Sequence, residues 1–386
     1  MSARVIFHID LNAFYATAAQ IEDPSLKGKP VAICRNSRGA VVTTASYEAR
    51  AFGVKSAMPL AVALQKCPEL VVVDPDFSLY RRLSDQFIEY IKTISPIVEV
   101  LSIDECFVDV TKQIKQFKRP LDLAVKIQND LKEIHQLSCS IGVAPNRFLA
   151  KMASDFKKPM GISVLRKREV KQKLWPLPIE SFYGIGKVTQ AKLKDIGIYT
   201  IGDLACCDTH KLEPILHNQT HTLKERANGN DSSILETDTE VKSISASNSL
   251  FSGVTDYEEL ISVLYEQCQD IHNKCKKHEL MGQTLTVSVG FNQEKSTSTS
   301  KRYESGLYHL NDIYEGALTL FDGYDLDEMV TFVSTGLNNL IPYVEEDEIF
   351  NLFNYNNADH SVSDIITKIN SLFDTDVVKK ASDEND

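Results

Sequence analysis

The segment VEVLSIDECFVDV, residues 98–110, is an apolar run interrupted by two adjacent acids. Apolar residues flank a polar bend, and this pattern predicts two short strands that pair across a tight turn. Two acids, Asp104 and Glu105, stand side by side at the bend. Because burying a carboxylate is costly unless a cation compensates it, these acids among core-forming residues indicate a cation-binding site.

A third acid stands at the end of another predicted strand. Residues 5–10 form a short apolar run that ends in Asp10. Neighbouring strands lie about 4.8 Å apart, so Asp10 and the 98–110 hairpin would bring the acids to one rim of a sheet. Carboxylates that converge in this way stay ionised only beside cations. Oxygen ligands favour Mg²⁺ or Mn²⁺, and two ions about 3.5–4 Å apart suit phosphoryl or nucleotidyl transfer.

The neighbouring acids at the bend are not equivalent. Consecutive strand residues point to opposite faces, so Asp104 and Glu105 share one site when the bend rotates one of them. We expect Asp10 and Asp104 to form the firmer pair. A solvated turn is the plain alternative for the tetrapeptide SIDE.

Bulk composition indicates a globular protein of several domains. The chain has 386 residues, enough for two to four domains, and its 43% hydrophobic and 25% charged content is ordinary for that class. The first ten residues do not resemble a signal peptide, and no run of about 18 apolar residues occurs, so a cytoplasmic protein without membrane contact is expected. The eight cysteines form no CxxC pair and are expected to be reduced core residues. A zinc site of Cys206, Cys207, His217 and His221 is the alternative.

The net charge of −11 is unevenly distributed. Residues 1–241 carry 32 Lys and Arg against 28 Asp and Glu, whereas residues 242–342 carry 7 against 14 and residues 343–386 carry 3 against 11. The acidity therefore lies at the C-terminal end. Because local patches rather than the total charge set phosphate binding, the overall charge does not exclude a nucleic-acid partner.

Periodicity predicts alternating helices and strands, typical of an α+β sheet layered with helices. The expected strands are 5–10, 31–34, 41–46, 70–74, 98–101, 106–110 and 139–143, and the expected helices are 13–22, 47–52, 60–67, 77–94 and 121–135. Asn146 can cap a helix that follows the strand at 139–143. Residues 167–230 are expected to be mostly helical. Beyond a polar linker, strands are expected at 242–250, 283–293 and 329–337 and helices at 257–277 and 310–321.

Five longer segments carry a family resemblance. They are FHIDLNAFYA (7–16), TTASYEARAFGVKSAMP (43–59), LSIDECFVDV (101–110), SIGVAPNRFLAKMASDFKKPMGI (140–162) and YGIGKVTQAKLKDIGI (183–198). In this order they closely resemble the Y-family translesion DNA polymerases of the bacterial polymerase IV type, over residues 1–340. The resemblance implies a right-hand polymerase. Its parts are a palm (1–11 and 75–166), short fingers (12–74), a helical thumb with a helix-hairpin-helix (167–230), a linker (231–241), an α/β little finger that grips DNA (242–342) and an acidic tail (343–386).

The resemblance also implies roles for the acids. Asp10 and Asp104 would hold two Mg²⁺ ions, with Mn²⁺ as an alternative and the Leu11 carbonyl as a backbone ligand. Glu105 would ligate or support the ion nearest the primer 3′-OH. Tyr15 matches the steric gate, an aromatic ring that leaves no room for a ribose 2′-OH; a core aromatic is the alternative.

Further positions match the family's triphosphate binders. These are Thr44, Tyr47, Arg50 and Lys158. Arg and Lys provide charge-assisted hydrogen bonds to phosphate oxygens, and Tyr47 and Arg50 are three residues apart on one helical face. Without the resemblance, Lys158 reads as an exposed loop lysine before Pro159.

Two segments are candidates for contacts with the DNA backbone. In GIGKVTQAKLKDIGI, Gly184 and Gly186 allow close approach, and amides beside Lys187 at the next helix start can bind a phosphate. An ordinary αα-hairpin is the alternative. In the little finger, the expected contacts are Lys295, Ser296, Lys301 and Arg302, although the acidity of this domain casts doubt on its grip; a plain exposed sheet face is the alternative.

The tail contains IFNLF, which resembles the sliding-clamp peptide of polymerases through Ile349, Leu352 and Phe353. Isoleucine stands where glutamine is usual, and a disordered tail with a transient helix is the alternative.

The resemblance implies a low-fidelity, template-directed DNA polymerase of DNA repair and mutagenesis. It would extend a primer past damaged bases with dNTPs, in the cytoplasm at the nucleoid. A catalytically silent accessory protein that binds DNA and the clamp, and a nucleotidyl cyclase with a similar palm, are the alternatives.

Overall fold

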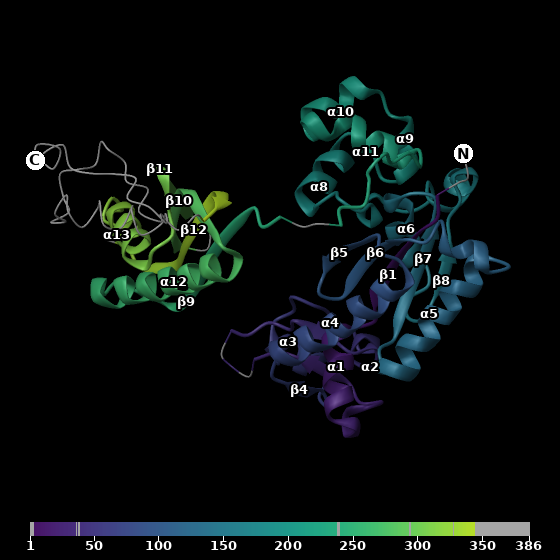
Figure 1. Cartoon of the computed structure of the whole chain (residues 1–386), viewed down its shortest axis with the longest axis horizontal. Coiled ribbons are helices and arrows are strands. Elements are labelled where there is room, and N and C mark those ends of the chain that lie inside the picture. Colours follow the sequence, from purple (N-terminus) through teal and green to yellow (C-terminus); the bar gives the residue numbers. More distant parts are fainter. Residues whose placement is uncertain are drawn as a thin grey trace, which may run out of the picture. The chain divides into compact units, whose positions relative to one another are not determined.

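The computed structural model describes residues 4–35, 37, 39–237, 240–292, 295–326 and 328–343. The chain divides into two compact units, Met1–Glu240 and Val241–Asp386, which are described separately (Figure 1). Both units combine a β-sheet with helices, so the expected α+β class is confirmed.

The first unit is built on a five-stranded sheet in the order β5-β6-β1-β7-β8. Its strands are β1 (Ile6–Leu11), β5 (Val98–Ser102), β6 (Glu105–Asp109), β7 (Cys139–Ala144) and β8 (Ile162–Val164). The 98–110 stretch forms the predicted hairpin, β5 and β6, and β1 pairs antiparallel with β6 on one side and β7 on the other. The hairpin bend therefore lies beside the end of β1, as the sequence predicted.

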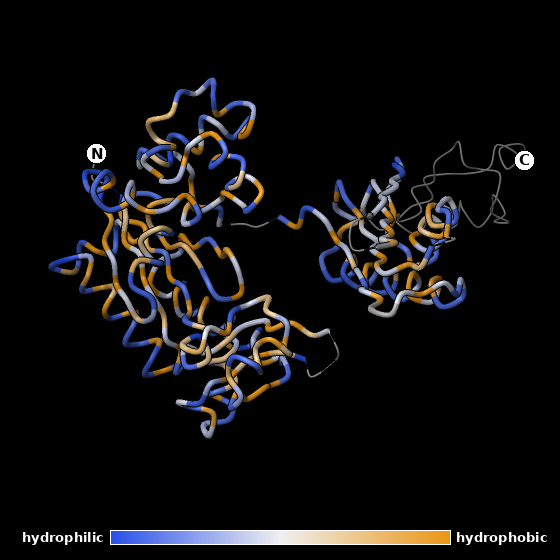
Figure 2. The backbone as a smooth tube through the Cα atoms, turned by 180° about the vertical axis from the view of Figure 1, so that it is seen from behind, coloured by the Kyte–Doolittle hydropathy of each residue, from blue (hydrophilic) through white to orange (hydrophobic). Residues whose placement is uncertain are grey.

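Helices cover both faces of this sheet. Phe7, Ile9 and Leu11 pack in one hydrophobic core with α4 (Phe77–Ile94) and α5 (Pro120–His135). The alternate residues of β1 face α6 (Arg147–Ser154), whose first turn is capped by the predicted Asn146 through a 2.9 Å bond from the Leu149 amide. Along the helices the backbone alternates between hydrophobic and hydrophilic stretches, as expected for helices with one buried face (Figure 2).

A glycine brings α6 close to the sheet. A Cβ atom on Gly142 of β7 would lie 2.0 Å from the Ala150 carbonyl oxygen and 2.5 Å from the Ser154 amide, both on α6. Only glycine fits this approach. The close packing places the side chains of α6 within reach of the polar residues on β1.

Residues 12–74 form a small layer with the three-stranded sheet β3-β2-β4. Its elements are α1 (Phe14–Glu22), η1 (Pro24–Leu26), β2 (Val31–Ile33), β3 (Thr44–Ala45), α2 (Tyr47–Ala51), α3 (Leu60–Lys66) and β4 (Val71–Val73). The strand expected over 41–46 was too long. Val41 bridges Pro59, and the Val42 amide bonds the Met58 carbonyl, so this part of the chain pairs away from β2.

Residues 167–230 are mostly helical, as predicted. The helices are α7 (Val170–Lys173), α8 (Lys187–Asp195), α9 (Ile201–Cys206), α10 (Thr209–Leu216) and α11 (Thr220–Ala227), with short turns η2 (Gln113–Gln116), η3 (Lys167–Glu169), η4 (Ile179–Ser181) and η5 (His217–Gln219) along the unit. Within the described residues, Cys206, Cys207 and the two nearby histidines form no metal-binding group, so the zinc alternative is not supported.

The second unit is a four-stranded antiparallel sheet in the order β11-β10-β12-β9, covered by two helices. Its elements are β9 (Ser243–Val254), α12 (Tyr257–His278), β10 (Leu280–Asn292), β11 (Lys295–Leu307), α13 (Leu310–Phe321) and β12 (Val330–Pro342). Leu285, Val287 and Val289 are buried in its core. Ile349, Leu352 and Phe353 of the tail lie outside the described residues. Among the helices described, none combines the length and the apolar character needed to cross a membrane.

Candidate active site

A cavity of about 300 Å³ opens where β1 ends. It is lined by Asp10, Leu11, Ala13, Phe14, Thr44, Tyr47, Arg50, Asp104, Glu105, Lys151 and Lys158. These residues come from β1, the start of α1, β3, α2, the hairpin bend, α6 and the segment after α6. The cavity brings together every residue that the sequence assigned to the metal ions and to the triphosphate.

Strand pairing explains why the acids meet. In the register of β1 and β6, Asp10 lies opposite Glu105. The Leu11 amide then donates a 2.9 Å hydrogen bond to the carbonyl of Asp104, which ties the bend to the end of β1. Asp10 is thus fixed by backbone hydrogen bonds at the same rim as the two acids of the bend, which are distant from it in sequence.

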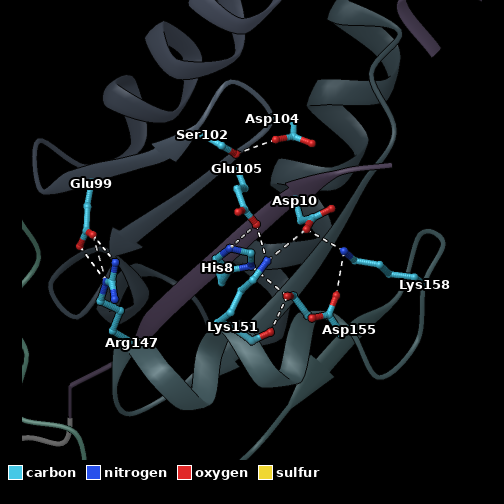
Figure 3. Close-up of polar contacts among 11 residues, drawn as sticks. His8, Asp10, Glu99, Ser102, Asp104, Glu105, Arg147, Lys151, Asp155 and Lys158 are labelled. Atoms are coloured by element: carbon cyan, nitrogen blue, oxygen red, sulfur yellow. Dashed lines mark hydrogen bonds and ion pairs between the residues drawn. The ribbon is translucent and has the colours of Figure 1, made fainter. Parts of the chain in front are cut away.

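The acids at the bend have different partners (Figure 3). Oε2 of Glu105 lies 3.2 Å from Nε2 of His8 and also forms an ion pair with Lys151. By contrast, Oδ1 of Asp104 accepts a 2.6 Å hydrogen bond from the Ser102 hydroxyl. Ligand atoms of His8, Asp10 and Glu105 all lie within 4.8 Å of one another. Asp10 is therefore gathered with Glu105, while the Asp104 carboxylate sits on the cavity wall.

The electrostatics of the cavity keep Glu105 charged. Burial alone would raise the pKa of Glu105, but its contacts with His8 and Lys151 hold that pKa at about 2. Burial lowers the pKa of His8 to about 4, which leaves the ring neutral near pH 7. Burial also acts to lower the pKa of Lys158, but the neighbouring Asp10 carboxylate outweighs it and raises that pKa. Burial raises the pKa of Asp10, although the charges of Lys158 and Lys151 act in the opposite direction. The cavity therefore holds an ionised Glu105 and the ammonium group of Lys158.

The donor set fits a hard divalent cation. Carboxylate oxygens of Asp10, Asp104 and Glu105 and the backbone of Leu11 line one cavity, and such oxygen ligands are those that Mg²⁺ and Mn²⁺ prefer. His8 is fully buried and does not line the cavity. Its ring nitrogens contact Glu105 and the Ser154 hydroxyl, so His8 supports Glu105 from behind.

Cations also line this cavity. Nζ of Lys158 lies 2.6 Å from Oδ2 of Asp10 and 2.8 Å from Oδ1 of Asp155. The Arg50 guanidinium lies 4.8 Å over the Tyr47 ring, and its Nε donates to the Ala45 carbonyl at 2.9 Å. These contacts hold two cationic heads where a polyanion could enter beside the acids.

The start of α1 adds a feature that the sequence reading missed. Ala13, which precedes the helix, has φ 44° and ψ 46°, and no side chain caps the first turn. Uncapped amides at a helix N-terminus favour anions, and Ala13 and Phe14 line the cavity. The backbone here can therefore receive a phosphate.

Tyr15 lies one residue beyond the cavity lining. Its ring stacks on Tyr80 at 4.2 Å with an interplanar angle of 21°. Burial, and then the charge of Asp104, raise the pKa of its hydroxyl. The aromatic contacts hold the Tyr15 ring in place, and the charge of Asp104 acts on its hydroxyl group.

Lys151 was also missed. It lies on α6, its side chain is 12% exposed, and its Nζ contacts Glu105 and lies 3.5 Å from Oδ2 of Asp10. The signal in the sequence is a single lysine within FLAKMA, because a charge inside an otherwise apolar helical run needs a partner.

Residues 184–187 form a turn that leads into α8. Gly184 has a φ of +98°, which favours glycine, and Gly186 precedes α8 without a side-chain cap. Gly186 and Lys187 are exposed. This arrangement leaves the helix amides and a lysine free to approach a phosphate.

Among the described residues of the second unit, α12 and α13 pack on one face of the sheet and leave its other face uncovered. Alternation along β10 places Thr284, Thr286 and Ser288 opposite its buried residues. Their neighbours on the other strands are mainly hydroxyl residues: Ser243, Ser245, Ser247, Ser296, Ser298, Ser300, Arg302, Ser334 and Asn338. We call this surface the hydroxyl face. It offers small hydrogen-bond donors, a composition suited to phosphate contacts.

The predicted DNA-contact residues of β11 divide between the two faces. Ser296 and Arg302 belong to the hydroxyl face, whereas Lys301 pairs with the buried Leu285 and takes the helix-covered side. The side chain of Lys295 lies outside the described residues. Several acids of this unit, including Glu259, lie on α12, away from the hydroxyl face, so net charge is a poor guide to that face.

Sequence comparisons match one family along most of the chain. A sequence model of the impB/mucB/samB family matches residues 9–155, that of the family's C-terminal domain matches 241–349, and that of the IMS family HHH motif matches 167–198. The chain is 36% identical to DNA polymerase IV of Oceanobacillus iheyensis, across 99% of this chain and 93% of that protein. It is also 36% identical to DNA polymerase IV 1 of Bacillus subtilis, across 98% and 93% of the two chains.

Solved structures of DNA polymerases match the fold of this chain. The fold matches a Y-family DNA polymerase chimera of Dbh and Dpo4 with a TM-score of 0.80 and 28% identity, covering 88% of this chain and 99% of the chimera. An insertion ternary complex of Dbh DNA polymerase matches with a TM-score of 0.65 and 27% identity, covering 88% and 99%.

Proposed function

We propose, from the premise that this chain belongs to the Y family of DNA polymerases, that it extends primers past damaged template bases with low fidelity by two-metal nucleotidyl transfer. The chain is a DNA-directed DNA polymerase, and its homology implies binding of DNA and a nucleotide and use of a divalent metal. The observation that carries the proposal is the cavity in which Asp10, Asp104 and Glu105 face Arg50 and Lys158.

The acids are assigned to the metal ions. Asp10, Asp104 and the Leu11 carbonyl would hold two Mg²⁺ ions, with Mn²⁺ as an alternative, and Glu105 would serve the ion nearest the primer 3′-OH. When bound, these ions supply positive charge at the reacting phosphate and the attacking oxygen. His8 and Lys151 keep Glu105 ionised and turned toward Asp10.

The cationic and hydroxyl side chains of the cavity are assigned to the triphosphate. In nucleotidyl transfer the primer 3′-oxygen bonds to the α-phosphorus and pyrophosphate leaves. Arg50, Lys158 and the amides at the start of α1 would stabilise the charge on the leaving group. Thr44 and Tyr47 would contribute hydroxyl groups.

Tyr15 is assigned to sugar selection. Its ring is fixed by stacking on Tyr80 and by edge contact with Phe77 at 6.3 Å. A rigid ring below the sugar would exclude a 2′-OH by contact, which gives preference to deoxynucleotides.

Residues 12–74 form a small cover. With short strands and three helices, they present little surface that could test the shape of a base pair. A small cover would tolerate damaged bases and would give low fidelity. We assign DNA-backbone contacts to Gly184, Gly186 and Lys187, and to the hydroxyl face with Ser296 and Arg302; Lys295 and Lys301 stay candidates.

We also propose that the tail binds the sliding clamp through Ile349, Leu352 and Phe353. The support is the apolar IFNLF sequence after four consecutive acids. Deleting residues 344–386 should leave short-primer extension intact and abolish stimulation by the clamp; unchanged stimulation would reject this part of the proposal.

The test of the proposed function is primer extension on a template with one abasic site. The protein with Mg²⁺ and dNTPs should insert opposite the site and continue, and Asp104→Ala should do neither while keeping the unfolding transition of the parent. A protein that extends undamaged templates but always stops at the abasic site is a polymerase without the proposed bypass. Normal extension by Asp104→Ala would reject the two-metal assignment.

A further inference from the structure

Two ammonium groups already neutralise the acids of the active site (Figure 3). Nζ of Lys158 lies 2.6 Å from Oδ2 of Asp10, and Nζ of Lys151 lies 3.5 Å from the same oxygen. Lys151 also forms an ion pair with Oε2 of Glu105. Two of the three carboxylates that would bind a divalent cation, those of Asp10 and Glu105, are thus already paired with lysines.

The charges lining the cavity balance. Three carboxylates, from Asp10, Asp104 and Glu105, face three cations, from Arg50, Lys151 and Lys158. A balanced cavity attracts a dication weakly, because each new ion must displace an ammonium group or share its carboxylate.

We propose that Lys151 and Lys158 compete with divalent cations for Asp10 and Glu105, so that the enzyme holds metal tightly only after a nucleotide triphosphate has drawn Lys158 away. This inference rests on the proposed function, because it takes the acids as metal ligands and Lys158 as a triphosphate ligand. It assigns to Lys151, in addition to its contact with Glu105, the control of metal affinity.

The two lysines differ in their freedom to move. Lys151 stands within α6, 12% exposed, and its carbonyl accepts a 2.7 Å hydrogen bond from Ser154. Its Nζ lies 5.9 Å over the ring of Tyr183. Lys158 follows α6, is 27% exposed and has a second carboxylate partner in Asp155. Lys151 is therefore the fixed counter-charge, and Lys158 is the one that a polyanion can redirect.

Redirecting Lys158 changes the balance in the direction that favours metal. Once phosphate oxygens bind Lys158 and Arg50, the three carboxylates retain Lys151 alone among the cations that line the cavity. Nucleotide binding would then raise metal affinity, and by linkage metal would raise nucleotide affinity by the same factor.

Direct Mn²⁺ binding to the protein without DNA or nucleotide tests the proposal, with free Mn²⁺ measured by its paramagnetic resonance signal. Lys151→Met and Lys158→Met each remove one competing charge and should bind Mn²⁺ about tenfold more tightly than the parent. Lys151→Arg keeps the charge and should stay near the parent. Lys132→Met, an exposed lysine of α5, is the control for net charge and should change nothing. Asp10→Asn should lose the site and so identifies it.

If both methionine variants bind Mn²⁺ no more tightly than the parent and Lys132→Met, the competition is rejected. Urea unfolding followed by the fluorescence of the single tryptophan, Trp175, checks the fold of each variant. Should Lys151→Met not fold, Lys158→Met alone decides, since its partly exposed side chain lies outside the helix. Primer extension by the parent separates the two levels: no extension rejects the proposed function, whereas extension without the Mn²⁺ effect rejects this inference alone.

Discussion

The ion pair of Glu99 and Arg147 is expected to hold α6 against the hairpin, and its loss should destabilise the first unit strongly. The guanidinium Nε lies 3.0 Å from both carboxylate oxygens, and its second nitrogen lies 2.6 Å from Oε1. The side chains are 17% and 8% exposed. Arg147 also lies 4.6 Å over the Phe107 ring, and Glu99 accepts a bond from the Glu236 amide.

Arg147→Ala would leave Glu99 buried with one backbone donor. Removing one partner of a buried pair costs about 3–5 kcal/mol, because the remaining charge stays desolvated. The double variant Glu99→Ala with Arg147→Ala removes both charges, so its loss should fall short of the summed single losses by about 2 kcal/mol.

Urea unfolding followed by Trp175 fluorescence reports this unit specifically, because the only tryptophan lies in it. Arg119→Ala is the matched control: its ion pair with Asp122 is 73% and 33% exposed and should contribute less than about 1 kcal/mol. If Arg147→Ala lowers the free energy of unfolding as little as Arg119→Ala does, the buried ion pair contributes no more to stability than the exposed one, contrary to this prediction.

Two further outcomes are expected. Tyr15→Ala should allow ribonucleotide incorporation, measured by comparing the rates with UTP and dTTP in matched single-nucleotide assays. If the variant still discriminates against UTP as strongly as the parent, Tyr15 is not the residue that excludes the 2′-OH. In native protein, a thiol reagent at pH 8 should modify the exposed Cys206 first and the half-buried Cys207 more slowly. The six buried cysteines should react after unfolding only, since burial raises the pKa of thiols such as Cys139, to about 12; rapid labelling of all eight would contradict the described core.

Strand pattern made the convergence of the acids predictable. The apolar runs that end in Asp10 and flank the 103–104 bend each specify a strand, and pairing them leaves one rim for the acids. The sequence also indicated the helix cap at Asn146, whose position before an amphipathic run is local information.

Tertiary contacts decided what the sequence left open. Which bend acid joins Asp10 depends on His8 of β1 and on Lys151, and Lys151 reaches Glu105 because Gly142 lets α6 approach the sheet. The strand expected over 41–46 was shortened by pairing with residues 57–59, a competitor that periodicity does not reveal.

The net charge of the second unit likewise does not describe a single face of its sheet. Net charge sums over both faces of a sheet, whereas a DNA backbone contacts one. The hydroxyl face carries serine and threonine side chains and Arg302, while acids such as Glu259 and Asp270 lie on α12.

The central claim is that carboxylates meeting at the end of β1 carry out template-directed nucleotide addition. Its most direct measurement is the single-turnover rate of one correct dNTP addition to a primer–template, for the parent protein and for Asp10→Asn, which preserves size and removes charge. We predict rapid addition by the parent and a loss of about a thousandfold or more in the variant, with unchanged DNA binding and unfolding. An Asp10→Asn protein that adds the nucleotide at the parental rate would contradict the account.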